Sequence, residues 1–306
     1  MAKTIVNNNI KLKSGGGVIN DATDGLSVSD SAILLQYCDG SDGDVTISVD
    51  TTLSRNMFYN NLTINDGIKL IPNGYLIFVK ETINCIGTGK IAQDYNSSSP
   101  SGAILPAPVE GAAAKTSGTG GNNGSASVKS LSNLAGKNGG AVGSIAGGAG
   151  GAVSSLPNTR KNTFVFGNFY DIEGTSVVRY TLTGGAGGGA RGGGWSWDTS
   201  PGYGGAGGTS GGMIFVVART IGVLNLSAIG GPGGNGGDGS NQYGDGGGGG
   251  AGGNGGYCFV AYKNKTTITA TLTGGAGGAG GTRLGSGYNG EPGSAGNSGV
   301  LVELVL

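Results

Sequence analysis

Three long blocks of the chain are built from glycine triplets, and they restrict the fold more than any other feature. The blocks span residues 184–212, 230–256 and 274–299. A period of three matches the left-handed extended helix, which has three residues per turn and a rise of roughly 3.1 Å. An α-helix is excluded, because each interior glycine costs about 1 kcal/mol relative to alanine. We therefore predict that each block is a finger that runs out, turns at a less glycine-rich tip and returns.

Such fingers must pack against one another to be stable. An isolated glycine segment stays disordered, because glycine loses the most entropy on folding, whereas packing several side by side pairs every buried amide and carbonyl. The 71 glycines are bounded by runs of Ile, Val, Leu, Phe and Tyr, which argues against general disorder, and 8 prolines are too few for collagen. We expect no room for a branched side chain at Gly234 or Gly237.

Apolar runs recur between the blocks. Residues 212–216, 256–260 and 299–303 repeat at spacings of 44 and 43, and residues 74–79 show the same pattern earlier. A second set repeats at spacings of 46 and 44, and in it apolar residues alternate with Arg, Thr, Asn and Ser over 178–182, 224–228 and 268–272. Alternation with a period of two is typical of strands. The predicted unit is a strand, a short link, a second strand and a glycine block.

The N-terminal part carries shorter strands. They are predicted at residues 45–47, 62–64, 68–70 and 76–78. The dipeptides Asp66-Gly67 and Asn73-Gly74 between them are strong turn signals. The predicted fold class is all-β, with β-solenoid or sandwich-like strand repeats and packed glycine-rich fingers of the polyglycine II type. The predicted domains are an attachment or cap region (1–44), a short-strand β module (45–109) and a glycine-rich repeat domain (110–306) with fingers at about 110–155, 184–212, 230–256 and 274–299.

Charge and cysteine content exclude several partners. Eighteen basic residues balance eighteen acidic ones without a basic cluster, so we predict no nucleic-acid partner. No apolar stretch has the length of a membrane span, and the N-terminus lacks the apolar core of a signal peptide. Three widely spaced cysteines support neither a disulfide framework nor a zinc site, and Cys258 is predicted to be a buried thiol.

The residues that usually carry catalysis are missing or badly placed. The chain has no histidine, which removes the usual general base and metal ligand. The acidic residues Asp198, Asp238, Asp245 and Glu291 lie in glycine blocks rather than in facing pairs on strands, and they are too few for a calcium cage. Matches to Gly-x-Gly-x-x-Gly follow from the composition, because no helix follows them. We predict no enzymatic activity, no cofactor and no metal.

The finger tips hold the candidate binding residues. The first tip carries Trp195, Trp197 and Tyr203, the second carries Tyr243, and the third carries Arg283 and Tyr288. Aromatic side chains at such positions are rigid and amphipathic, and are suited to stacking on sugar rings or on a protein surface. The alternative is that they fold back over the finger ends or over a seam between subunits. The sequence leaves both interpretations open.

The runs at residues 40–48, 59–65 and 73–79 resemble the N-terminal module of glycine-rich structural proteins of tailed phages. The glycine blocks are similar in style to the receptor-binding adhesins at phage tail-fibre tips, in which packed polyglycine helices form a core and variable loops at the finger ends bind the host surface. The likeness covers residues 40–95 by motif and 110–306 by architecture. The N-terminal module departs from the compact tip adhesins, which leaves the position on the particle open.

The resemblance implies a virion surface protein, assembled in the host cytoplasm, that serves as a host-receptor-binding adhesin or a tail fibre or spike component. Its partners are then other virion proteins and a host cell-surface glycan or outer-membrane protein, and it is expected to be a homo-oligomer such as a trimer. The second hypothesis is a purely structural head fibre or decoration protein. A third, a self-assembling extracellular filament, lacks an export signal.

Overall fold

The structure is a computed structural model of the 306-residue chain. It describes residues 38–97, 105, 202–239 and 244–306, and elsewhere only the backbone of six strands. These described parts contain strands but no helix, which confirms the all-β class. The strands are β1 (Asn9–Lys11), β2 (Val18–Ala22), β3 (Gly25–Ser27), β4 (Asp44–Ile47), β5 (Thr51–Thr52), β6 (Met57–Tyr59), β7 (Asn61–Ile64), β8 (Lys69–Ile71), β9 (Ile77–Cys85), β10 (Lys90–Ala92), β11 (Thr163–Val165), β12 (Asn168–Glu173), β13 (Ser176–Arg179), β14 (Met213–Ser227), β15 (Tyr257–Thr271) and β16 (Val300–Val305).

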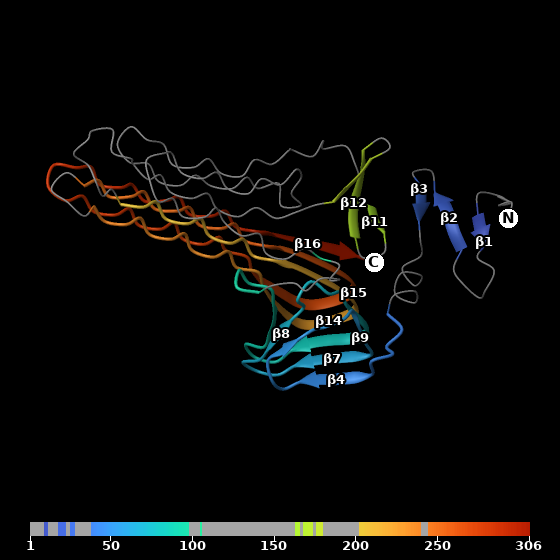
Figure 1. Ribbon diagram of the computed structural model, residues 1–306. Helices are drawn as coiled ribbons and strands as arrows, with labels where there is room; N and C mark the ends of the chain where they lie inside the picture. The colour runs from blue at the N-terminus through green and yellow to red at the C-terminus, as the bar shows by residue number, and fades with distance from the viewer. Residues whose placement is uncertain are drawn as a thin grey trace.

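Ten of these strands form one parallel sheet. Its order is β4-β7-β9-β14-β10-β8-β5, with β15 and β16 added beyond β14 and β6 paired to β9. Strand β14 pairs with β9 along its middle and with β10 near its end, so the sheet curls back and is nearly closed. Figure 1 shows β4, β7, β9, β14, β15 and β16 stacked in this order. β1–β3 and β11–β13 form two separate antiparallel sheets.

The short strands and turns predicted for the N-terminal part are present. The predicted runs coincide with β4, β7, β8 and the beginning of β9. Gly67 and Gly74 have φ angles of 73° and 82°, and Asn73 has a φ of 55°. Glycine and asparagine are the residues that adopt this left-handed region most readily, so both turn dipeptides are explained by their backbone geometry.

The long repeat sets the register of the last three strands. Met213 lies opposite Tyr257, 44 residues later, and Tyr257 lies opposite Val300, 43 residues later, as the spacing of the apolar runs predicts. The predicted short link is wrong, because β14 and β15 are each continuous strands of 15 residues. Strand β14 can stay continuous because β9, β10 and β15 pair with it along its length, and a register shift between Ala218 and Thr220 absorbs the irregularity.

Alternate residues of the long strands face two apolar layers. Ile214 and Val216 join the larger core cluster inside the curl, whereas Phe215 and Val217 join a second cluster on the other face. Burial on both faces explains why the first halves of β14 and β15 are continuous apolar runs rather than alternating ones. Each fully buried Val, Leu or Ile stabilises the fold by about 1.5–3 kcal/mol. In the second cluster the phenylalanine rings form a column with centroid distances of 5.1, 6.1 and 5.1 Å along Phe58, Phe78, Phe215 and Phe259.

Candidate functional site

Five glycine-rich segments extend from one end of the sheet and lie side by side as a rod (Figure 1). Three lead into β14, β15 and β16, and two follow β14 and β15, so neighbouring segments run both parallel and antiparallel. We name them G1 (202–212), G2 (228–239), G3 (244–256), G4 (272–282) and G5 (287–299).

Main-chain hydrogen bonds join these segments at every third residue. The N–H groups of Gly202, Gly205 and Gly208 in G1 donate to main-chain oxygens of G3 at 2.8, 2.9 and 2.7 Å. The same three-residue spacing recurs between G2 and G1, G3 and G2, G4 and G3, G3 and G5, and G5 and G4. The rod is therefore held by backbone groups, which explains how a sequence with so few side chains forms an ordered structure.

Segment G3 lies at the centre of the rod, and its successive residues bond to different neighbours. The oxygen of Asp245 accepts from G1, the N–H of Gly246 donates to Tyr288 in G5 at 2.9 Å, and the N–H of Gly247 donates to Gly237 in G2 at 2.8 Å. Every residue of G3 is buried. A side chain on most of its glycines would meet main-chain atoms: a Cβ on Gly250 would lie 1.8 Å from the oxygen of Ala206.

Gly234 and Gly237 are tightly packed, as expected, but they do not make the tightest contacts of G2. A Cβ on Gly234 would lie 3.0 Å from the main-chain nitrogen of Ala206, and one on Gly237 would lie 2.7 Å from the Tyr203 ring. The contacts are tighter one residue earlier, because a Cβ on Gly233 or Gly236 would lie 2.0 or 1.9 Å from a main-chain oxygen of G3. The triplet pattern predicts tight glycines but does not say which glycine of each triplet faces which neighbour.

The polar residues in the triplets bind the neighbouring segment. Side-chain oxygens of Asn235 and Asp238 in G2 accept hydrogen bonds from the N–H groups of Ala279 and Thr282 in G4, at 2.9 and 2.7 Å. The Thr282 hydroxyl also donates to Asp238, and these bonds hold the pKa of Asp238 below its usual value. Asp245 and Asn254 in G3 accept main-chain N–H groups of G5 in the same way. This role was not predicted from the sequence.

The loop between G4 and G5 ends the rod and contains two of the predicted site residues. Arg283 does not extend freely: its N–H donates to Asn289 Oδ1 at 2.9 Å, and its guanidinium donates to the oxygen of Gly287 at 3.1 Å. The N–H of Tyr288 donates to Asp245 in G3. The loop is therefore held by its own contacts, while the side chains of Tyr288 and Leu284 are 56% and 48% exposed. Leu284 was not predicted, because a single leucine in a polar loop carries no periodic signal.

The structure brings Tyr203 and Tyr288 to the same level of the rod. Both lie beside the beginning of G3, where Gly202 donates to the oxygen of Asp245 and Gly246 donates to the oxygen of Tyr288. Tyr203 belongs to G1 and Tyr288 to G5, and both are exposed. The predicted residues Trp195, Trp197 and Tyr243 lie outside the described residues.

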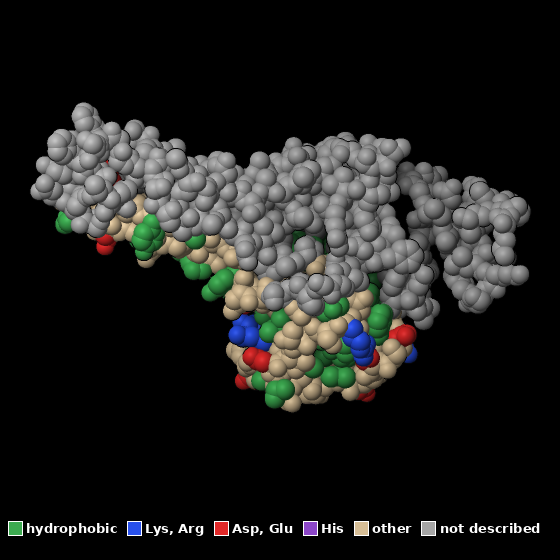
Figure 2. Space-filling model, viewed as in Figure 1, with side chains coloured by type: hydrophobic (Ala, Val, Ile, Leu, Met, Phe, Trp, Pro, Cys, Tyr) green, Lys and Arg blue, Asp and Glu red, His purple; other side chains and the backbone are tan. Residues whose placement is uncertain are grey.

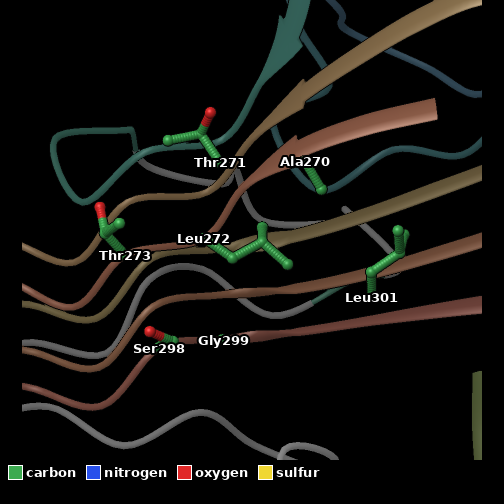
Figure 3. Close-up of a pocket in the computed structure, with 7 residues that line it drawn as sticks. All are labelled: Ala270, Thr271, Leu272, Thr273, Ser298, Gly299 and Leu301. Atoms are coloured by element: carbon green, nitrogen blue, oxygen red, sulfur yellow. The ribbon is translucent and has the colours of Figure 1, made fainter.

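A shallow hollow lies where β15 and β16 meet the rod (Figure 3). Its seven lining residues offer only hydroxyl, main-chain and apolar groups, without a carboxylate, amine or thiol: Ala270, Thr271, Leu272, Thr273, Ser298, Gly299 and Leu301. Such a lining suits packing or hydrogen bonding better than acid–base chemistry.

The outer edge of the sheet is incomplete beside this hollow. Strand β16 pairs only with residues 257–262, so within the described residues the second half of β15 has no strand on that side. Residues 263–267 are exposed, as are Leu304 and Val305 of β16. At the point where the pairing ends, the Tyr262 hydroxyl donates to Glu303 at 2.7 Å and Lys265 forms an ion pair with the same carboxylate.

The described residues also bear on metal sites and membrane spans. In ranges 38–97, 202–239 and 244–306, three or more Cys, Asp or Glu side chains nowhere come together in a way that could hold a metal ion. The same part of the chain has no helix long and apolar enough to cross a membrane.

Comparison with known proteins gave no match: no family model, no curated protein and no solved structure is similar to this chain. The resemblance to phage proteins therefore depends on the amino-acid sequence alone.

Proposed function

We propose that the chain is a virion surface protein of a tailed phage, in which a glycine-rich rod presents a host-binding loop at a distance from a β-solenoid body. The observation that carries this proposal is the loop between G4 and G5. It lies at the end of the rod far from the sheet (Figure 1), and it exposes Leu284 and Tyr288 on a backbone held by Arg283, Asn289 and Asp245. A rigid loop with exposed apolar and aromatic side chains binds a partner at little entropic cost.

The proposal includes a more detailed fold, with packed polyglycine II fingers on a β-solenoid. The three-residue hydrogen-bond spacing and the contacts that exclude a Cβ support packed polyglycine II fingers. The parallel registers support a β-solenoid, because Asp44 pairs with Asn61, and Leu62 with Ile83, so consecutive turns of chain lie on one another. A stiff rod on a solenoid suits a fibre or spike, which must hold its binding loops away from the particle.

A structural virion protein without adhesive function is the second candidate, and the incomplete sheet edge favours it. Within the described residues, no strand pairs with the outer side of the second half of β15, and its backbone, together with the exposed Leu304 and Val305, is available to another subunit. In this alternative the protein is a head fibre or decoration protein, and its partners are other virion proteins. In both candidate functions the chain lies on the particle surface. They differ in what the rod contacts: the host in one, another virion protein in the other.

Localisation and competition test the proposal together. Antibodies to the full-length protein should label the outside of purified particles in electron micrographs, and added protein should reduce adsorption of those particles to the host bacterium. The double variant Leu284→Ser, Tyr288→Ser should compete at least about tenfold less well, because interface anchors of this kind often contribute about 2 kcal/mol or more. Label on the particle without competition supports the structural candidate, and absence from the particle overturns both.

The proposed role includes no catalysis. Purified protein incubated with host surface polysaccharide is expected to release no new reducing ends over hours. A steady release that grows with protein concentration would contradict the non-enzymatic proposal.

A further inference from the structure

Two tyrosine rings lie directly on the glycine backbone of segment G2. A Cβ on Gly231 would lie 2.7 Å from the ring of Tyr95, and a Cβ on Gly237 would lie 2.7 Å from the ring of Tyr203. In both cases the three nearest atoms all belong to the tyrosine side chain, whereas other glycines of the rod meet main-chain atoms. The absence of a side chain at these two positions is therefore what lets each ring rest against the rod.

Both rings remain open to solvent on their other sides. Tyr95 is 41% exposed and Tyr203 is 57% exposed. The N–H of Tyr95 donates to the oxygen of Ile229 at 2.9 Å, and the oxygen of Tyr203 accepts from Gly237 at 2.8 Å, so both backbones are tied to G2. The rings are thus exposed and already fixed in position, and binding through them loses little conformational entropy.

The two rings form a straight row along one flank of the rod. Gly231 and Gly237 are six residues apart, which corresponds to about 19 Å at the rise of an extended three-residue helix. Between them, the three atoms nearest to a Cβ on Gly234 all belong to the backbone of Ala206, so a small residue rather than a large side chain lies against G2 at this point. Figure 2 shows hydrophobic side chains at intervals along the exposed lower edge of the rod.

Polar side chains near this row are engaged inside the molecule. Asp94, next to Tyr95, accepts hydrogen bonds from the Ser227 hydroxyl and the Ile229 N–H at 2.7 and 2.9 Å. Asn235 and Asp238 accept from G4, as described above. Between Gly231 and Gly237, the exposed residue of G2 that carries an apolar side chain is Pro232. The flank therefore offers aromatic and backbone groups with little free charge.

We propose that the Tyr95–Tyr203 row binds a linear, neutral polysaccharide, whose sugar rings stack on the two tyrosines while the chain lies along G2. Sugar rings expose flat C–H faces that pack on aromatic rings, and a straight uncharged strip matches an extended uncharged chain better than it matches a globular protein surface. This inference rests on the proposed adhesin function and gives it a second contact surface, on the flank of the rod rather than at its end.

Retardation in native gels tests the inference. The full-length protein is run through gels cast with dextran, pullulan or mannan, and its mobility is compared with that in a plain gel. We expect at least one polysaccharide to retard the wild type. The double variant Tyr95→Ala, Tyr203→Ala should lose about tenfold or more in apparent affinity. The control Val49→Ala shortens an exposed apolar side chain of the β module, outside the row and outside the loop between G4 and G5, and should be retarded like the wild type.

A second variant separates stacking from folding. Tyr95→Phe with Tyr203→Phe keeps both rings and should keep binding, and thermal melting shows whether the alanine pair still folds. Three results would each overturn the inference. The phenylalanine pair could lose binding, the alanine pair could be retarded as strongly as the wild type, or none of the three polysaccharides could retard the wild type. If no polysaccharide retards the wild type but the wild type still competes for adsorption, the adhesin proposal stands and only the inferred polysaccharide is wrong. If the wild type neither competes nor occurs on particles, the adhesin proposal fails as well.

Discussion

Gly278 and Gly234 lie so close that a Cβ on Gly278 would come within 1.9 Å of the main-chain oxygen of Gly234. At the same time the N–H of Gly278 donates to the oxygen of Gly250 in G3 at 2.8 Å. Its oxygen also accepts from the N–H of Gly293 in G5 at 2.9 Å, so one residue of G4 touches three other segments through its backbone alone. The next residue, Ala279, is exposed and carries its methyl group without burial. Adjacent positions of one triplet therefore tolerate substitution very differently.

The first prediction compares these two neighbours. Gly278→Val should lower the free energy of unfolding by about 1–3 kcal/mol, the range usual for overpacking, because the main chain of G2 must move away. Ala279→Val should change it by less than about 0.5 kcal/mol, as is usual for surface substitutions. Denaturant unfolding of both variants measures the difference. Equal stabilities would mean that the glycine segments are loosely packed in solution.

The sequence predicted the repeat well because the repeat controls register directly. A spacing of 44 residues between apolar runs aligns Met213 with Tyr257, and alternation within the runs determines which residues face each other. The pairing of β14 with β9 could not be predicted in the same way, because Val216 lies opposite Ile77, which is 139 positions earlier in the sequence (216 minus 77). Nothing in the local pattern of either strand specifies which of several similar apolar runs becomes its neighbour.

The candidate site was predicted less well, for a different reason. Aromatic residues at the tips stand out in composition, so Tyr203 and Tyr288 could be named from the sequence; both are exposed, and their role in binding stays a prediction. Tyr95 was missed because it belongs to the β module by sequence and reaches the rod only in the folded chain, where it contacts Gly231. The prediction that Arg283 is a receptor-binding candidate stays a prediction; its hydrogen bond to the carbonyl of Gly287 was not foreseen, because a sequence does not show which carbonyl groups lie near a charged side chain in a tight loop.

The second prediction concerns acid sensitivity at the end of the sheet. Hydrogen bonds from Lys265 and Tyr262 hold the pKa of Glu303 below its usual value. A carboxyl whose folded pKa is depressed stabilises the fold above its unfolded pKa, and this contribution is lost as the pH falls through the folded pKa. Hydrogen exchange of β16 amides should therefore be slow at pH 7 and faster at pH 3, relative to intrinsic rates.

Glu303→Gln supplies the control for this prediction. Glutamine keeps an acceptor for the Tyr262 hydroxyl but removes the charge that binds Lys265, so protection of β16 should be lower at pH 7 and change less between pH 7 and pH 3. The effect should be small, because the side chains of the pair are partly exposed. A variant with the same pH dependence as the wild type would assign the acid sensitivity to other carboxylates.

The third prediction is that the native protein resists thiol reagents. Burial raises the pKa of Cys38 to about 12 and also raises the pKa of Cys85 and Cys258. All three are free and buried, and the thiolate is the reactive form. With an aromatic disulfide reagent at pH 8, the folded protein should react far more slowly than the protein in denaturant, in which all three thiols should react. Rapid release of one equivalent from the folded protein would show that one of these thiols becomes exposed in solution.

The fourth prediction comes from the sequence alone, because Trp195 and Trp197 lie outside the described residues. Two tryptophans so close together within a block of glycine and alanine favour a contact surface, because tryptophan left facing solvent would lower solubility. Changing both to serine should leave thermal melting and particle assembly unchanged and lower host-cell binding by at least about tenfold. Failed assembly would instead indicate a contact with another subunit, and undiminished binding would remove this tip from the receptor site.

The last prediction separates two roles for Arg283. Because its guanidinium donates to Gly287 and its N–H donates to Asn289, we expect Arg283 to act by holding the loop that presents Leu284 and Tyr288. Arg283→Ala should speed hydrogen exchange and proteolytic cleavage at residues 283–289. It should weaken host-cell binding by about tenfold or less. One hydrogen bond from a charged group stabilises the loop by about 1.5–3 kcal/mol, and only part of this free energy affects the affinity for the receptor. Lys263→Ala, which removes an exposed cation from β15 instead, should change neither property. If Arg283→Ala abolishes binding while exchange and cleavage of the loop stay at the wild-type rate, the arginine contacts the receptor itself, and the positioning role is wrong.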